Sequence, residues 1–259
     1  KTMKHIVSIS GGIASFATAK RVVEKFGPDN TVLLFADTKM EDEDLYRFLD
    51  EGTKYLKTEL ITLTEGRDVW EVFHDHKFLG NSRVDICSKY LKRDLLKKWI
   101  KERYKPEEMV MYVGLDWTEG HRIKNIKRNW LPYQVEAPLT WNPIKSKPDL
   151  FEDLKTIKIE PPRLYAMGFP HNNCGGFCIK AGKANFANLL KQMPERYAYH
   201  EKKEEEMRKY LDKNVSILRD RRKGKTKPLT LKKWREEIET NPQMSFMDKI
   251  DWGGCGCAI

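Results

Sequence analysis

Five cysteines give this sequence its strongest capacity for metal or redox chemistry. Cys174 and Cys178 are separated by three residues, two of them glycines, and Cys255 and Cys257 stand close together near the end of the chain. The fifth, Cys87, precedes a short basic segment. In a reducing cytosol an odd number of closely spaced thiols favours metal or redox chemistry over structural disulfides. We therefore expect one metal centre, with the ligands Cys87, Cys174, Cys178 and Cys255.

The spacing of the thiols favours an iron–sulfur cluster over zinc. Cys174 and Cys178 form a C-x-x-x-C pair, whereas zinc knuckles typically use C-x-x-C. Zinc is therefore the second expectation for the metal. The sequence leaves open whether Cys255 or Cys257 completes the set. At any one of these positions a buried, unligated cysteine is the alternative interpretation.

The segment 10–15, with the sequence SGGIAS, has the composition of a phosphate-binding turn. It follows the apolar run 6–9 and precedes a helix-like stretch, 16–23. Glycines let backbone N–H groups approach an anion, and the first turn of a helix offers unpaired donors and the positive end of its dipole. The spacing matches neither the P-loop nor the dinucleotide fingerprint, and a turn without a ligand is the alternative. The residues predicted to bind a nucleotide here are Ser10, Gly11, Gly12 and Ser15.

Further polar or flexible positions follow other predicted strands. Asp37 and Thr38 end one strand-like run, and Gly114 ends another, with Arg122 in the segment after it. Asp37 could accept hydrogen bonds from a ribose or a base edge, although Asp and Thr are also common helix caps. Arg122 has the planar guanidinium that clamps a phosphate through two hydrogen bonds. We therefore add Asp37, Thr38 and Gly114 to the predicted nucleotide site.

The elements that position these residues alternate between strand and helix in the first half of the chain. The strand-like runs are 6–9, 31–36, 59–63 and 109–113, and the helix-like runs are 16–23, 41–51, 69–73 and 91–100. This alternation predicts an α/β fold with a doubly wound, mostly parallel sheet and helices on both of its faces. Ligands of such folds bind outside the carboxyl ends of the strands, where the predicted site residues lie.

After about residue 140 the character of the sequence changes. Prolines punctuate the chain, and helix-like runs follow at 183–193, 195–211 and 230–238. The charged run 201–206 is predicted to be the solvated face of a helix. We predict two units, a nucleotide-binding α/β domain over 1–140 and a cysteine-bearing, largely helical C-terminal extension over 141–259 that packs on it.

The charge of the chain suits a polyanionic partner or a phosphate-rich substrate. Its 259 residues include 48 basic and 38 acidic ones, for a formal net charge of +10. Much of the surplus lies in 219–227, which is either a solvated basic loop or a contact to nucleic acid. With no apolar stretch of membrane-spanning length and no signal-peptide pattern at its start, we expect a cytoplasmic protein without a membrane contact. The order of a Ser/His/Asp triad and the H-E-x-x-H motif are absent, so hydrolase and zinc-protease functions find no support.

Taken together, these segments resemble the phosphoadenylyl-sulfate (PAPS) reductase family, within the adenine nucleotide α-hydrolase (PP-loop) superfamily. The resemblance covers nearly the whole chain and is carried by the segments 10–15, 35–38, 87–92, 114–122, 138–141 and 171–183. It implies an adenine nucleotide-binding fold with the nucleotide held by the first loop and by Asp37. In some members it also implies a 4Fe–4S cluster.

Two departures from the family pattern shift the expected reaction. The acidic residue expected in the first loop is Ala14 here, and the tail lacks the Glu and His that flank the nucleophilic cysteine of assimilatory reductases. The twin glycines, by contrast, are retained and favour a bound triphosphate. This chain therefore resembles the PP-loop sulfur-transfer enzymes, including those of DNA phosphorothioation and tRNA thiolation, more than it resembles the assimilatory reductases. In that interpretation ATP with Mg²⁺ activates an acceptor as its adenylate, and sulfur is delivered either through cysteine or through the cluster. Cys257 is the nucleophilic thiolate, and Lys92, Arg122 and the helix N-terminus neutralise phosphate charge.

ATP-dependent sulfur transfer is accordingly the first expectation for the function. The alternative is reduction of phosphoadenylyl or adenylyl sulfate to sulfite, and a further alternative is a non-catalytic nucleic-acid-binding module. The expected partners are an adenine nucleotide and either a nucleic acid acceptor or a protein that donates sulfur or electrons. The oligomeric state is left open, with a homodimer among the alternatives.

Overall fold

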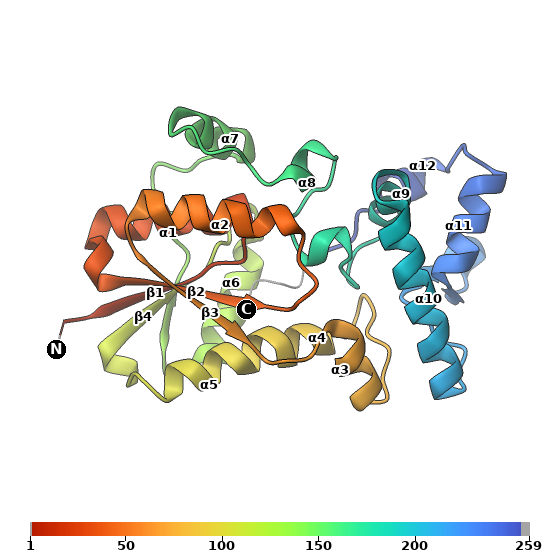
Figure 1. Cartoon of the computed structure of the whole chain (residues 1–259), viewed down its shortest axis with the longest axis horizontal. Coiled ribbons are helices and arrows are strands. Elements are labelled where there is room, and N and C mark those ends of the chain that lie inside the picture. Colours follow the sequence, from red (N-terminus) through yellow and green to blue (C-terminus); the bar gives the residue numbers. More distant parts are fainter. Residues whose placement is uncertain (1, 255–259) are drawn as a thin grey trace.

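A five-stranded, fully parallel sheet lies at the centre of the first half of the chain (Figure 1). The structure is a computed structural model that describes residues 2–254. The strands are β1 (Lys4–Ser8), β2 (Thr31–Asp37), β3 (Glu59–Thr64), β4 (Met109–Tyr112) and β5 (Gln134–Glu136). Their spatial order is β3-β2-β1-β4-β5. Because the order reverses between β1 and β4, the loops that follow these two strands form the crevice in which such sheets bind ligands.

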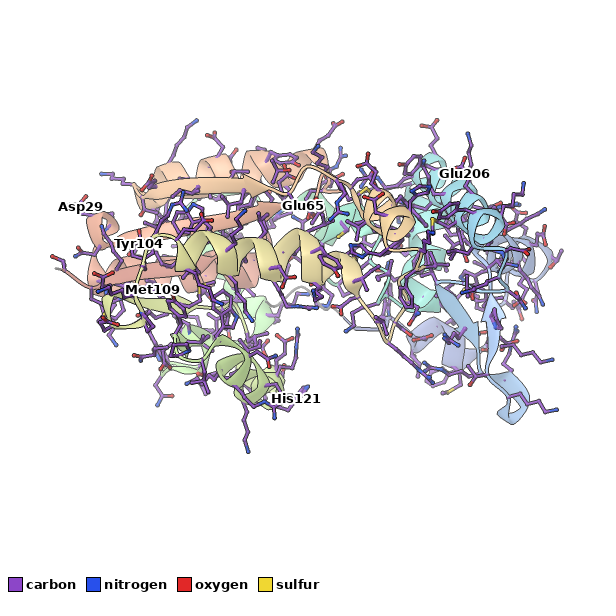
Figure 2. All side chains as sticks on the ribbon, turned by 90° about the horizontal axis from the view of Figure 1, so that it is seen from below. Asp29, Glu65, Tyr104, Met109, His121 and Glu206 are labelled. Atoms are coloured by element: carbon purple, nitrogen blue, oxygen red, sulfur yellow. The ribbon has the colours of Figure 1, made fainter. Side chains whose placement is uncertain are left out.

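Helices cover both faces of this sheet, as the sequence predicts. Successive residues of a strand point to opposite faces, so Val7 packs with α1 (Ile13–Phe26) and α2 (Glu43–Leu56), whereas Ile6 packs with α5 (Leu95–Lys101) and α6 (Gly120–Trp130). Figure 2, seen from below, shows α5 along the second face and His121 at the outer start of α6. The prediction of a doubly wound α/β fold is therefore confirmed.

The connection from β3 to β4 is more segmented than the sequence suggests. It contains α3 (Val69–Asp75), the short α4 (Ile86–Ser88), a π-helical segment (Lys89–Asp94) and then α5. A π-helical turn widens the helix and is frequent at functional sites. Here it begins two residues after Cys87.

The chain after β5 first returns to the sheet. Helix α7 (Lys147–Thr156) packs its Leu150 and Leu154 into the cluster that α1 forms with the sheet, and the short α8 (Arg163–Ala166) follows. This packing brings Lys147 and Tyr165, which are far from the first loop in the sequence, beside that loop. The division of the chain after residue 140 stays a prediction.

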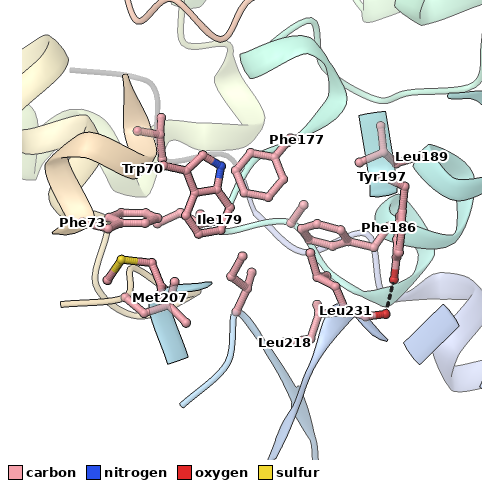
Figure 3. Packing of buried hydrophobic residues seen from close by; sticks show 14 of the residues in the cluster. Trp70, Phe73, Phe177, Ile179, Phe186, Leu189, Tyr197, Met207, Leu218 and Leu231 are labelled. Atoms are coloured by element: carbon pink, nitrogen blue, oxygen red, sulfur yellow. Dashed lines mark hydrogen bonds between the residues drawn. The ribbon is translucent and has the colours of Figure 1, made fainter. Parts of the chain in front are cut away.

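The remaining elements form a largely helical region with its own core. They are α9 (Lys183–Gln192), α10 (Pro194–Leu211), β6 (Leu218–Asp220), β7 (Lys227–Leu229), α11 (Leu231–Thr240) and α12 (Phe246–Ile250). Their core includes Trp70 and Phe73 of α3, which pack near Phe177 (Figure 3). The basic run 219–227 lies in an antiparallel hairpin, where residues 221–226 form the loop between β6 and β7. None of the helices within 2–254 combines the length and apolar character needed to cross a membrane.

One expectation about α10 is wrong. The run 201–206 is predicted to be the solvated face of a helix, yet Glu204 within it is fully buried. Its carboxylate accepts hydrogen bonds from the backbone N–H of Ile217 (3.3 Å) and of Leu231 (2.8 Å). Burial raises the pKa of Glu204 to about 7. The side chain thus joins α10 to the hairpin and to α11, a long-range role that charge patterning on one helix does not show.

His200 makes the stability of this region sensitive to acid. The ring is 1% exposed, stacks on Phe177 at 3.6 Å between ring centroids, and accepts a hydrogen bond at Nδ1 from Trp70 Nε1 (3.1 Å). Burial, with the nearby Arg196, lowers the pKa of His200 from 6.5 to about 3. The unfolded chain therefore takes up a proton near pH 6.5 that the folded chain takes up only near pH 3. Acidification through this window favours the unfolded state.

We expect the free energy of unfolding to fall below pH 6.5 by about 1.4 kcal/mol per pH unit from this group alone. Urea unfolding followed by circular dichroism at several pH values measures this slope. The variant His200→Gln cannot take up that proton, so its slope in the same window should be shallower by this amount. Equal slopes in the two proteins would show that His200 does not titrate as its burial requires.

Candidate active site

The segment 10–15 forms a tight turn from β1 into α1. Gly11 has φ +81°, a left-handed conformation that favours glycine, and a Cβ there would lie 2.5 Å from the buried Leu45 side chain. Ser15 Oγ accepts a hydrogen bond from Ser10 N (3.1 Å) and donates one to Gly12 O (2.9 Å). These bonds fix the turn from within.

Two donors at the start of α1 are available to an anion. Within residues 2–254 the backbone N–H groups of Ala14 and Ser15 have no hydrogen-bond partner, while that of Ile13 donates to Tyr165 Oη (3.2 Å). The first N–H groups of a helix lack intrahelical acceptors, and the helix dipole adds positive potential at this end. The turn therefore has the geometry of an anion site.

A cavity of about 140 Å³ lies over this turn, and we call it the loop cavity. The predicted site residues that line it are Ser10, Gly12, Ser15, Gly114 and Arg122. Gly11 lies between two of them in the chain. The structure thus brings most of the predicted nucleotide site to the crevice between β1 and β4.

Gly114 is needed because β4 ends against the start of α1. A Cβ at this position would lie 2.9 Å from both Cα and N of Ser15, which are backbone atoms that side-chain rotation cannot move. Arg122, on α6, forms an ion pair with Glu119 in the same cavity. An anion that binds Arg122 therefore competes with Glu119 for the guanidinium.

Three residues of the loop cavity were missed by the sequence reasoning as site residues. Lys147 Nζ donates to Pro170 O (2.5 Å), and partial burial lowers the pKa of Lys147, although the residue as a whole is exposed. Tyr165 contributes the hydroxyl that accepts from α1. Asn172 Nδ2 donates to Gly11 O (2.9 Å), and its buried Oδ1 has no hydrogen-bond partner in the described part of the chain. Of these three residues, only Asn172 lies in a part of the sequence that pointed to function, because it belongs to the segment 171–183 that carries the family resemblance.

A second cavity, of about 20 Å³, is lined by three of the predicted thiols, and we call it the cysteine cavity. Cys87 reaches it from α4, and Cys174 and Cys178 reach it from the segment before α9. Cys255 and Cys257 lie outside the described residues. The described chain nevertheless ends beside this cavity, because Gly254 N donates to the backbone oxygen of Lys180 (3.0 Å), a residue that lines it.

A buried carboxylate organises one wall of the cysteine cavity. Glu41 accepts hydrogen bonds from Cys174 N (2.7 Å) and from Thr38 Oγ1 (3.1 Å), and Lys92 Nζ lies 3.8 Å from it. Thr38 and Lys92 both line this cavity and not the loop cavity. The sequence places Glu41 in an acidic helical stretch and does not reveal this role, because Cys174 and Lys92 come from distant segments of the chain.

Asp37 lies apart from both cavities. Its carboxylate accepts hydrogen bonds from Lys39 N (2.8 Å) and from Tyr46 Oη (3.0 Å), and it lines neither the loop cavity nor the cysteine cavity. Its predicted contact with a ribose stays a prediction.

The thiols are suitable metal ligands by donor type, but the described ones are not spaced as the ligands of a metal centre. Thiolates are the ligands preferred by iron–sulfur clusters and accepted by zinc. Within 2–254, however, no three His, Cys, Asp or Glu side chains gather closely enough to hold a metal ion. The cavity has room for about one water molecule, judged by the 10–15 Å³ that about one probe sphere needs. A cluster would therefore require the cavity to widen and the thiols to be rearranged around it.

One short segment joins the two cavities. His171, Asn172 and Asn173 line the loop cavity, and the next residue, Cys174, lines the cysteine cavity. The segment is held from both sides, by the bond of Asn172 to Gly11 O and by the bond of Cys174 N to Glu41. A ligand at the first loop would thus lie next to the thiols.

Similar solved structures include a phosphoadenylyl-sulfate (PAPS) reductase from Candida auris in a phosphate complex, at 14% identity, with 64% of this chain and 78% of that chain covered and a TM-score of 0.48. An NMN synthetase from Francisella tularensis is 16% identical, with 61% and 63% covered and a TM-score of 0.43. An NH3-dependent NAD synthetase from Campylobacter jejuni is 11% identical, with 83% and 86% covered and a TM-score of 0.43.

No curated protein matches the chain. The sequence model of one family, the phosphoadenosine phosphosulfate reductase domain, matches residues 4–176, which is more than half of the chain. The matched residues include the whole sheet, the lining of the loop cavity, and Cys87 and Cys174 of the cysteine cavity. The chain therefore belongs to the phosphoadenosine phosphosulfate reductase domain family.

Proposed function

We propose that this protein is an ATP-dependent sulfur-transfer enzyme. ATP would bind in the loop cavity, and a 4Fe–4S cluster would be held by Cys87, Cys174, Cys178 and Cys255. The observation that carries the proposal is the segment 171–174, which lines both cavities and donates from Asn172 Nδ2 to Gly11 O at 2.9 Å. This arrangement supports a nucleotide and a thiolate centre that act on one acceptor.

The loop cavity supplies complementary groups for a triphosphate. The N–H groups of Ala14 and Ser15 and the positive end of α1 would bind phosphate oxygens, with Lys147 and Arg122 as cationic neighbours. Asn172 Oδ1 is an acceptor, so it suits a donor such as a ribose hydroxyl or a water molecule on Mg²⁺ and not a phosphate oxygen. The retained glycines therefore support binding of a nucleotide, whereas Ala14 offers no carboxylate to Mg²⁺.

The proposed reaction has two substitution steps. First, an acceptor oxygen attacks the α-phosphorus of ATP, pyrophosphate leaves, and the acceptor adenylate forms. Second, the terminal sulfur of a Cys257 persulfide attacks the activated atom, and AMP leaves with the oxygen. An external dithiol then reduces the Cys257–acceptor disulfide, which releases the thiolated acceptor and returns the thiol. Cationic groups near the phosphates stabilise the charge that develops in the first step.

When bound, an iron–sulfur cluster supplies redox-active iron and bridging sulfide. The chain's own contribution at that centre is to bring three thiols to the wall of one cavity and to hold the backbone of Cys174 through Glu41, which also faces Lys92. A reducing cytoplasm suits such thiolates.

The test of the proposed function is product analysis with anaerobically purified protein. With ATP, Mg²⁺, a persulfide donor and candidate acceptors, we expect AMP and pyrophosphate in equal amounts, and only when an acceptor is present. Failure of the protein to bind any adenine nucleotide would rule out the proposal.

Reduction of a sulfonucleotide is the second candidate, and the family match favours it. There the Cys257 thiolate would attack the sulfur of adenylyl or phosphoadenylyl sulfate, the nucleotide would leave, and a dithiol would release sulfite. Release of sulfite from either sulfonucleotide with thioredoxin, without any need for ATP, would select this reaction.

A further inference from the structure

A groove of about 700 Å³ runs beside the last residues that the structure describes, and we call it the basic groove. Segments from three parts of the chain form it, at residues 82–83, 180–183 and 217–222, and α12 with the residues after it closes one side. The basic side chains that line it are Arg83, Lys180, Lys183, Arg219, Arg221 and Arg222. The acidic ones are Asp248 and Asp251. This excess of positive charge is the electrostatic character of a site for a polyanion.

Part of the charge is neutralised within the protein. Lys183 Nζ forms a buried ion pair with Asp248 Oδ1 at 2.9 Å. Arg222 makes a two-pronged contact with Asp220, at 2.7 and 3.0 Å. These pairs shape the groove and leave little of their charge to a ligand.

Three arginines keep their charge for a ligand. Within 2–254 the guanidinium groups of Arg83, Arg219 and Arg221 form no ion pair and no hydrogen bond with the protein. The Nε of Arg219 is buried and unpartnered, which is uncommon because buried donors are normally paired. An oxygen acceptor from a bound molecule would satisfy it.

An apolar and aromatic surface adjoins these cations. Met247 and Ile250 of α12 line the groove and are 69% and 51% exposed, and Phe246 beside them is 74% exposed. Trp252, just after α12, is 37% exposed. Cationic grooves with neighbouring aromatic rings bind single-stranded nucleic acids, since phosphates contact the cations and bases stack on the rings.

The basic groove borders the cysteine cavity, and Trp252, between the groove residues Asp251 and Gly253, connects it to the neighbourhood of the loop cavity. Lys180 lines the groove and the cysteine cavity. Trp252 lines a hollow of about 280 Å³ together with Lys147 and Tyr165, and these two residues also line the loop cavity. A strand in the groove with one base on Trp252 would therefore end close to the nucleotide and the thiols.

We propose that the basic groove binds a single-stranded nucleic acid, with phosphates on Arg83, Arg219 and Arg221 and a base stacked on Trp252, and that this strand is the sulfur acceptor. The acceptor role rests on the proposed function, whereas the binding does not. A duplex is disfavoured, because paired and stacked bases do not offer a free face to Trp252.

Fluorescence anisotropy with the full chain tests the binding. The probes are labelled RNA and DNA single strands of one sequence and the corresponding duplexes, over a series of salt concentrations. The first variant is Arg83→Ala/Arg221→Ala, whose two side chains are exposed and unpaired, so the fold should be unaffected. Arg128→Ala is the matched control, because Arg128 is equally exposed and lies on α6, away from the groove.

We expect single strands to bind more tightly than duplexes, and a comparison of RNA with DNA identifies which strand is preferred. The double variant should weaken binding and reduce the slope of log K against log salt by roughly 0.7 for each lost phosphate contact. Trp252→Ala should weaken binding roughly tenfold, and Trp252→Phe should restore much of the loss because a ring is retained. Arg128→Ala should bind as the unaltered protein does.

Several results would overturn the proposal. They are equal affinity of the double variant and the Arg128 control, tighter binding of duplex than of single strand, and binding of an acidic protein but of no oligonucleotide. Failure of the proposed function is distinguished by measuring AMP release in the same preparations. Groove-dependent binding without AMP release rejects sulfur transfer and retains the site, whereas AMP release with a small acceptor but no oligonucleotide binding rejects the groove.

Discussion

Replacing Gly114 with alanine is expected to weaken ATP binding by as much as about a hundredfold, because misplacement of a binding group by about 1 Å can cost that much. The new Cβ would lie 2.9 Å from the backbone of Ser15, so the end of β4 and the start of α1 must move apart. The N–H groups that would bind phosphate belong to that first turn. Titration calorimetry with ATP measures the loss.

Gly120→Ala is the matched control for this change. Gly120 belongs to the same segment, begins α6 with helical backbone angles, and would meet nothing within 4 Å as alanine. We expect unchanged ATP affinity and a stability equal to or above that of the unaltered protein, by up to about 1 kcal/mol. If Gly114→Ala folds and binds ATP as tightly as Gly120→Ala, the loop cavity is not the ATP site.

The second large effect is expected at the thiols. Cys174→Ser should remove most of the iron, since a serine hydroxyl is a poor substitute for a thiolate ligand of a cluster. Cys255→Ser should do the same, whereas Cys257→Ser should retain the iron and lose sulfur transfer. Iron and sulfide analysis after anaerobic purification, with AMP release measured in parallel, separates the two roles.

Comparison of the Cys255→Ser and Cys257→Ser variants distinguishes the metal ligand from the nucleophile. Iron retained in Cys255→Ser but lost in Cys257→Ser would exchange the two assignments. Zinc in place of iron in the unaltered protein would overturn the cluster, and full activity of all three serine variants would remove the thiols from the mechanism.

Much of the sheet could be predicted because its signals are local. The apolar run before Gly11 and the runs that became β2, β3 and β4 each carry the strand signal in a few consecutive residues. The short β5 was not predicted, since its three residues are too few to show a period. The strands β6 and β7 were missed for the same reason, whereas the basic residues 221–226 between them form a loop.

The candidate site was predicted where its residues stand together in the chain and missed where the fold assembles them. Ser10, Gly12 and Gly114 were found from strand ends, and the structure places them around one cavity. Lys147 and Tyr165 reach the same cavity only because α7 packs on α1, which sequence periodicity does not specify. Buried carboxylates, such as Glu41 behind the wall of the cysteine cavity and Glu204 under the hairpin, depend on the same kind of long-range contact.

The claim that a nucleotide binds beside the thiolate centre is tested most directly by titrating anaerobically purified protein with ATP while recording both the heat of binding and the visible absorption of the iron centre. The predicted result is a saturable heat and an absorption change with the same midpoint, because the segment 171–174 touches both cavities. Folded, iron-containing protein that binds neither ATP nor any other adenine nucleotide would contradict the claim.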